Sequence, residues 1–166
     1  MDSVGKGARY SVEHMRNLTS AELETQWKKL NASNYAVTSN ATARYNCLAF
    51  ANGDERHWWD LGNGGRYYWP SHIKKEWTLD AWTKIFESGG YSKSGNRDAE
   101  AGKQKIAIYV DLEDLTPTHV AVSEGAMWKS KLGRLQDIEH ATLDSLEGSE
   151  GYEYGIVEIV FERLLK

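Results

Sequence analysis

The spacing of apolar and polar residues predicts helices in the first half of the chain. Two segments carry an apolar residue at every third or fourth position after a capping threonine: Leu23, Trp27 and Leu30 behind Thr19, and Leu79, Trp82, Ile85 and Phe86 behind Thr78. Residues 31–42 and 92–103, which are rich in small polar side chains, are expected to be loops. We expect an N-terminal arm over residues 1–17 and a single domain over residues 18–166.

The second half of the chain has the apolar and β-branched stretches typical of β-strands. Four stretches are predicted strands, of which the last alternates apolar and acidic residues: residues 105–110, 118–123, 126–131 and 154–164. A two-residue turn at Glu124-Gly125 would join the second and third of these as a hairpin. Residues 137–146 predict a short helix that ends at Gly148. Because helices come first and strands later, the pattern favours an α+β fold with helices packed on an antiparallel sheet.

Composition and charge limit the classes of function. A formal net charge of −4 over 166 residues predicts no basic surface for nucleic acid, and no apolar stretch has the length of a membrane span. The single cysteine excludes an intrachain disulfide, and the lack of a signal-peptide pattern favours a soluble, cytoplasmic protein. We expect no cofactor and no metal, because the chain has no phosphate loop, dinucleotide fingerprint or histidine-paired metal motif. Lys103 and Lys105 are expected on the surface.

The lone cysteine, Cys47, lies between Asn46 and the small apolar residues 48–51. This pattern predicts a thiol on the first turn of a short buried helix, where unpaired N–H groups and the helix dipole would lower its pKa. By residue type alone, a cysteine in an apolar stretch is more often a small buried hydrophobic residue than a nucleophile. The choice depends on whether the chain supplies a base.

Among the five histidines, His119 is the best candidate for that base. It lies at the start of a predicted strand, directly after Thr116-Pro117-Thr118, so the sheet would hold its ring at one end. The other four lie in the predicted arm, an aromatic segment, a turn and a predicted helix: His14, His57, His72 and His140. A cysteine on a helix followed by a histidine on a strand is the order found in papain-like hydrolases.

The segments Tyr45–Ala51 and Thr118–Val122 resemble the bacterial papain-like superfamily that includes the NlpC and CHAP cysteine hydrolases. The chain is also similar to a group of uncharacterised bacterial proteins that share further short segments in the same order: Trp58-Trp59, Gly90-Tyr91, Trp128–Gly133, His140 and Tyr154-Gly155. The resemblance covers roughly residues 40–160. It implies a papain-like fold with a cleft between the N-terminal helices and the C-terminal antiparallel sheet.

The resemblance implies that Cys47 is the nucleophile and His119 the general base and acid. The backbone N–H of Cys47 would contribute to an oxyanion hole, and both Tyr45 and the segment Asn34–Asn40 are candidates for the second donor. One further catalytic role remains to be assigned, that of the residue that orients the imidazole of His119.

Several residues are candidates for that third catalytic role. A two-residue turn would place Ser130 directly across from His119, whereas a one-residue change in loop length would place Lys131 there. Asp137 and His140 are close enough in sequence to fold back and take the role instead.

An aromatic segment follows the cysteine and is interrupted by the turn cluster Gly62–Gly65. Its rings either form a platform for a sugar or peptide or pack a long loop onto the domain: Trp58, Trp59, Tyr67, Tyr68 and Trp69. Tyr45, Asn46, Trp58 and Trp59 are the predicted binding residues.

Three functions remain open from the sequence. The first is a cysteine peptidase or amidase with a peptide or amide-containing substrate. The second is an inactive papain-like binding or regulatory module that contacts a protein partner through the aromatic segment. The third is a toxin-type peptidase or amidase that acts in conflict between bacteria.

Overall fold

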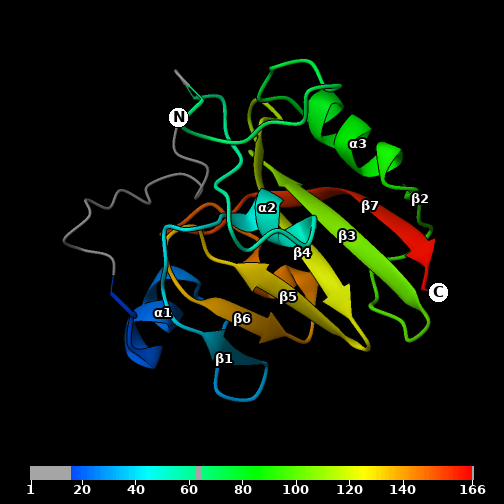
Figure 1. The fold of residues 1–166 in the computed structure, drawn as a ribbon. Coiled ribbons are helices and arrows are strands. Elements are labelled where there is room, and N and C mark those ends of the chain that lie inside the picture. The colour runs from blue at the N-terminus through cyan, green and yellow to red at the C-terminus, as the bar shows by residue number, and fades with distance from the viewer. Residues whose placement is uncertain (1–15, 63–64, 166) are drawn as a thin grey trace.

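The computed structural model describes residues 16–62 and 65–165, and their strands form one seven-stranded antiparallel sheet (Figure 1). Its order is β1-β6-β5-β4-β3-β7-β2. The strands are β1 (Tyr35–Ser39), β2 (Ser92–Lys93), β3 (Lys103–Val110), β4 (Pro117–Glu124), β5 (Met127–Lys131), β6 (Asp137–His140) and β7 (Ile156–Leu164). The helices are α1 (Ser20–Gln26), α2 (Cys47–Ala51), α3 (Leu79–Ser88) and the 3-10 helix η2 (Leu143–Leu146). The predicted α+β class is confirmed.

Helical elements cover both faces of the sheet. On one face α2 and α3 pack on alternate residues of the central strands, including Ile106, Ile108, Val120 and Val122. Figure 1 shows α2 in front of β4 and β5. On the other face α1 and η2 pack on the intervening residues, including Ala107, Tyr109, Ala121 and Trp128. We call these the α2 face and the α1 face. Because side chains alternate along a strand, two neighbouring strand residues lie on different faces.

The predicted caps form as the sequence indicates. Thr19 and Glu22 make a complete capping box at the start of α1, and the Thr78 hydroxyl accepts from the Ala81 N–H at the start of α3. Helix α1 is shorter than the apolar spacing from Leu23 to Leu30 predicts, because Trp27 is already extended. Leu30 is nevertheless buried, because the following turn returns it to the core on the α1 face.

Local predictions are wrong at three places. The loop predicted over residues 92–103 begins with the two-residue strand β2, which pairs with β7. Residues 137–146 form strand β6 followed by η2 rather than a helix, and the loop predicted over residues 31–42 contains strand β1. The reason is the same in these last two cases: β6 is hydrogen-bonded to β5 on one side and to β1 on the other. Pairing with neighbouring strands overrides a weak local helix pattern.

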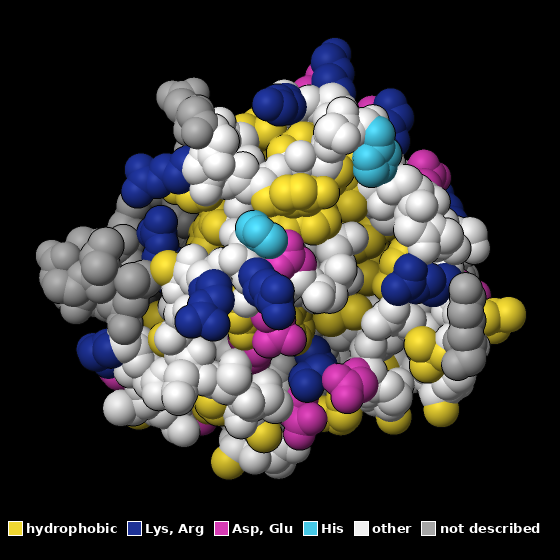
Figure 2. Space-filling view, in the orientation of Figure 1, with side chains coloured by type: hydrophobic (Ala, Val, Ile, Leu, Met, Phe, Trp, Pro, Cys, Tyr) yellow, Lys and Arg dark blue, Asp and Glu magenta, His cyan; other side chains and the backbone are white. Residues whose placement is uncertain are grey.

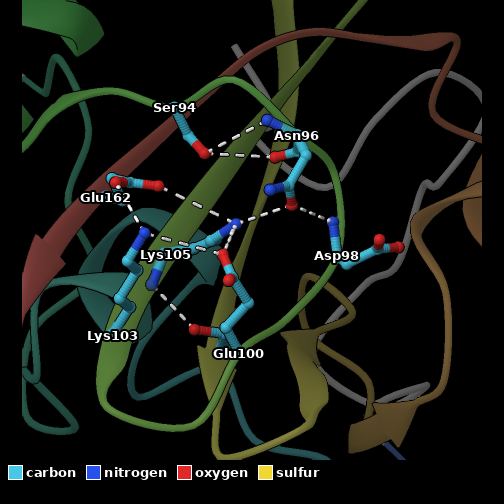
Figure 3. Close-up of polar contacts among 8 residues, drawn as sticks. Ser94, Asn96, Asp98, Glu100, Lys103, Lys105 and Glu162 are labelled. Atoms are coloured by element: carbon cyan, nitrogen blue, oxygen red, sulfur yellow. Dashed lines mark hydrogen bonds and ion pairs between the residues drawn. The ribbon is translucent and has the colours of Figure 1, made fainter.

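Lys105 is fully buried, which corrects its predicted place on the surface. Figure 3 shows its ammonium group among side chains of the loop that joins β2 to β3. The Lys105 Nζ lies 2.5 Å from Glu100 Oε2 and 2.8 Å from Asn96 Oδ1, and Lys103 bonds Glu162 on β7. The loop folds back over β3 because a buried ammonium group needs acceptors there.

The predicted N-terminal arm falls mostly on residues 1–15, including His14, which lie outside the described residues. The residue that follows the arm, Leu18, is hydrogen-bonded to Gln136, directly before β6. The Leu18 backbone N–H donates to Gln136 Oε1, and the Gln136 amide donates back to the Leu18 carbonyl. The chain is therefore fixed to the domain from this point onward.

Candidate functional site

Asn46 joins the cysteine helix to the aromatic segment. It is fully buried, and its Oδ1 caps α2 by accepting the Ala49 N–H. The same oxygen accepts the Trp59 N–H, and its Nδ2 donates to the Trp59 carbonyl at 2.8 Å. Asn46 therefore positions backbone rather than reaching a ligand with its side chain.

The Cys47 thiol is buried against the sheet, with 1% of the residue exposed. Burial raises the pKa of the thiol to about 12, although the backbone of Val120 and the charge of Lys131 act in the opposite direction. Helix α2 has five residues, so its dipole does not offset the loss of hydration. At neutral pH the sulfur is a protonated thiol in an apolar setting.

His119 lies on the opposite face of the sheet from Cys47, so the expected dyad is not formed. Cys47 packs with Val120 on the α2 face. His119, one residue earlier on β4, stacks on Tyr154 on the α1 face, with ring centroids 4.1 Å apart and planes 5° from parallel. The sheet backbone separates the thiol from the imidazole, because strand alternation sends neighbouring side chains to opposite faces.

His119 instead begins a buried chain of hydrogen bonds. Its Nε2 lies 2.9 Å from Ser130 Oγ, and that oxygen lies 2.8 Å from His140 Nε2. His140 Nδ1 lies 2.9 Å from the Thr142 carbonyl. The three residues that form this hydrogen-bond series, His119, Ser130 and His140, each have an exposed fraction of 0%. The contact between His119 and Ser130 is the one expected for the third catalytic residue, but it lies away from the thiol.

The Thr142 carbonyl, at one end of this series of hydrogen bonds, determines which group donates in each of them. The Thr142 carbonyl can only accept, so neutral His140 carries its proton on Nδ1 and accepts through Nε2. Ser130 then donates to His140 and accepts from His119 Nε2–H. His119 Nδ1 is left as a buried lone pair with no hydrogen-bond donor in the described part of the chain.

Both imidazoles are held neutral by their surroundings. Burial lowers the pKa of His140 to about 4, against a smaller opposite effect of the Thr142 carbonyl. Burial, with the nearby His140, lowers the pKa of His119 well below its ordinary value. Among the described residues the hydrogen bonds of these two histidines go to a hydroxyl and a carbonyl and not to a carboxylate, so the arrangement resists protonation.

The hairpin between β4 and β5 differs from the prediction by one residue on each strand. Gly125-Ala126 forms the turn, so that Glu124 pairs with Met127 and Ser123 with Trp128. Because the register changes by two residues, Ser130 keeps the same face and meets His119 diagonally instead of directly.

Lys131 and Asp137 lie on the α2 face and hold Tyr45. The Tyr45 hydroxyl lies 3.0 Å from Asp137 Oδ2, and Lys131 Nζ lies 5.1 Å from the centre of the Tyr45 ring. Lys131 also donates to the Thr42 and Gly133 carbonyls. Burial lowers the pKa of Lys131 to about 8 and raises that of Tyr45 to about 12. Tyr45 is therefore a buried support of the segment before α2.

The surface above this support contains a hollow of about 420 Å³. Its walls combine cationic and aromatic side chains: Arg44, Arg56, His57, Trp58, Arg66, Tyr67 and Tyr68, with Ala43 and Gly65. Figure 2 shows Lys and Arg side chains gathered around a histidine and apolar side chains on the face where Figure 1 places α2. We call this hollow the arginine groove. No carboxylate is among its described lining residues.

The three arginines of the groove are exposed and uncommitted. Within residues 16–62 and 65–165, no hydrogen bond or ion pair is formed by the guanidinium groups of Arg44, Arg56 or Arg66. Other cations of the chain are engaged: Arg97 with Glu147 at 2.8 Å, for example. Unpaired guanidinium groups around one hollow attract an anion.

A network around Asp54 holds the aromatic wall of the groove. Asp54 accepts the Trp59 indole N–H at 2.8 Å and lies 2.9 Å from His57 Nδ1. Burial opposes ionisation of Asp54, but the bonds from Trp59, the Arg56 backbone and His57 lower its pKa below the ordinary value. The Asp60 N–H donates to the Tyr68 carbonyl, and the Tyr68 ring lies 4.8 Å from that of Trp59. Contacts within the chain therefore hold the aromatic wall in place.

Of the predicted binding residues, Trp58 lines the groove, whereas Tyr45, Asn46 and Trp59 support it from within. The segment Asn34–Asn40, a candidate oxyanion donor, contains edge strand β1, paired with β6. His72 is exposed and contacts Ser88.

The three arginines of the groove were not among the predicted binding residues. The available signal was the position of Arg44 and Arg56 on either side of the cysteine segment, and of Arg66 beside the aromatic pair.

The described residues contain no cluster of metal-binding side chains and no helix with the length and apolarity needed to cross a bilayer. A family model described as a domain of unknown function (DUF7689) matches residues 36–162, which include the groove and every strand from β2 to β6. Neither a curated protein nor a solved structure matches the chain.

Proposed function

Because the chain belongs to the DUF7689 family, which has no described function, we propose a function from the site alone: a non-catalytic binding module that captures an acidic segment of a partner protein. The arginine groove is the binding site. In this proposal the domain keeps a papain-like arrangement, a cysteine helix on an antiparallel sheet, without the catalytic pair.

One observation carries the proposal: three arginines whose guanidinium groups have no partner among the described residues line one hollow, and the described lining of that hollow contains no carboxylate, in a chain whose net charge is −4. Because the protein carries a net negative charge, its overall composition does not account for a local cluster of unpaired arginines. Arginine forks bind carboxylates in a planar, two-point geometry.

The surroundings of Cys47 argue against a thiol hydrolase. The reaction needs a thiolate that a substrate can reach and an imidazole beside it. Here the thiol is buried with a pKa of about 12, and the nearest strand residue on its face is Val120. His119 lies behind the sheet.

Calorimetric titration with an acidic peptide, rich in Glu and Asp, tests the proposal against a basic peptide of equal length. We expect binding of the acidic peptide that weakens as salt is raised, because the attraction is between exposed charges. Arg44→Glu, Arg56→Glu and Arg66→Glu should each weaken it about 10-fold, since each replaces a fork by a repelling carboxylate.

Lys75→Glu and Lys93→Glu are matched controls, because both lysines are exposed and outside the groove lining, and their ammonium groups have no partner within residues 16–62 and 65–165. They make the same change in net charge and should alter the affinity less than about 2-fold. Equal weakening by control and groove variants would show an effect of net charge alone. That result, or the absence of binding by the unmodified chain, would refute the proposal.

A further inference from the structure

We propose that the anion recognised in the arginine groove is a phosphate monoester on an aromatic side chain, a phosphotyrosine of the partner segment. The inference rests on the proposed function and names its ligand. It follows from the number and type of the cations, from the state of the neighbouring carboxylates and from the aromatic wall.

The number of donors exceeds what a single carboxylate can use. Arg44, Arg56 and Arg66 each present a fork of N–H donors to the same hollow. A carboxylate offers two oxygens and one charge. A phosphate monoester offers three acceptor oxygens and a charge of about −1.5 to −2 at neutral pH, so it can engage several forks at once.

The Lys and Arg side chains in the described lining are all arginines, although lysines outnumber arginines along the chain. A planar guanidinium group binds phosphate oxygens in pairs and stacks on aromatic rings, whereas an ammonium group does neither. Arg134 already shows such stacking at the edge of the site, 5.3 Å from the centre of the Trp58 ring.

Two carboxylates of the aromatic segment, Asp54 and Asp60, are bonded within that segment. Asp54 is bonded by the Trp59 indole and by His57, and Asp60 by the Trp58 indole and the Leu61 N–H. They hold the aromatic segment in place and leave the arginine cluster with its charge. A dianionic ligand would supply the missing counter-charge.

The aromatic wall favours a ring beside the phosphate. Tyr68 is 42% exposed, and its backbone is fixed on both sides, since its N–H donates to the Trp58 carbonyl and its own carbonyl accepts the Asp60 N–H. An apolar ring can stack on that surface without reorganising it. The volume of about 420 Å³ lies in the range of sites for small organic groups, larger than one carboxylate requires.

Titration of the full chain with four peptides of one sequence tests the inference. The central residue is phosphotyrosine, phosphoserine, glutamate or tyrosine, and the salt concentration is 0.15 M. We expect phosphotyrosine to bind at least 10-fold more tightly than glutamate, with phosphoserine between them and tyrosine weakest. Free inorganic phosphate should compete only at concentrations far above those of the phosphotyrosine peptide.

Two variants separate the contributions of fork and ring. Arg66→Lys keeps the charge, so it should weaken phosphotyrosine binding about 10-fold while changing glutamate binding less than 3-fold. Tyr68→Ala should weaken phosphotyrosine more than phosphoserine. Lys75→Ala is the matched surface control and should change neither.

The outcomes distinguish this inference from the proposed function. If glutamate binds as tightly as phosphotyrosine, the acidic-segment module stands and the phosphate inference is wrong. If inorganic phosphate or vesicles of anionic lipid bind as tightly as the phosphotyrosine peptide, the assignment to a protein segment is wrong. If no anionic peptide binds, both proposals fail.

Discussion

The buried chain of His119, Ser130 and His140 predicts that the fold loses stability in mild acid. The folded state keeps both imidazoles neutral, since burial lowers their pKa values, whereas the unfolded chain exposes them with an ordinary pKa near 6.5. Below that pH the unfolded state binds more protons than the folded state. Stability is therefore complete above about pH 6.5 and falls as the pH drops toward the folded-state values.

The magnitude follows from His140, whose folded pKa is about 4. At pH 5 the unfolded form of this group gains a factor of about 30 from protonation, and the folded form gains almost nothing. The difference is about 2 kcal/mol relative to neutral pH. For a chain of this size, that lowers the unfolding midpoint by roughly 4–8 °C. His119 adds a loss of the same sign.

Denaturant unfolding followed by tryptophan fluorescence, at steps between pH 7 and pH 5, measures this loss. In His140→Gln the slope of stability against pH should fall by about one proton, because the remaining loss comes from His119. His72→Gln is the control, since His72 is exposed and bonded only to Ser88. If the His140→Gln variant and the unmodified chain lose equal stability over this range, the assignment of a buried neutral imidazole is refuted.

Three other predictions follow from the same packing. Iodoacetamide should label Cys47 slowly at pH 7 and at least ~100-fold faster in denaturant, because the native thiol is buried; rapid native labelling that disappears in His119→Ala would instead favour a nucleophile. Asn46→Ala should lower stability by about 3 kcal/mol in denaturant unfolding, since it removes a cap and leaves Trp59 backbone groups unpaired; an effect below about 1 kcal/mol would contradict this. Lys105→Met should speed proteolysis of the loop before β3 several-fold, whereas the exposed Lys84→Met should not; equal rates would show that the ion pair does not hold the loop.

Local sequence signals predicted the elements whose information is short-range. Thr19 and Thr78 cap their helices by accepting from backbone N–H groups three residues later, and the strands predicted over residues 105–110 and 154–164 correspond to β3 and β7. Such signals need no knowledge of the rest of the chain. Strands β1 and β6 were missed because each is short and depends on its neighbours, with β6 bonded on both edges.

The candidate site depended on information that the sequence does not hold locally. The order of a helix-borne cysteine and a strand-borne histidine is present, but their relation depends on which face of β4 turns toward α2. A change of one residue in strand phase exchanges Val120 for His119 beneath the cysteine helix. Pattern alone could not decide this, because residues 119–123 of β4 are buried on both faces, so the polar residues His119 and Ser123 do not mark a solvent-facing side.

The arrangement of polar groups favours binding at the rim over catalysis in the core. A base beside Cys47 would have to come from the α2 face of β4, where Val120 and Val122 stand, or from Lys131. Lys131 is occupied by two backbone carbonyls and supports Tyr45, so it cannot also move a proton for a substrate. The guanidinium groups of Arg44, Arg56 and Arg66, which have no partner in the described part of the chain, lie outside that core, at the groove formed by the segment that Asn46 and Asp54 hold in place. The buried hydrogen bonds of Asn46 and Asp54 therefore hold the backbone beneath an arginine-lined surface, as is expected of a preorganised binding site.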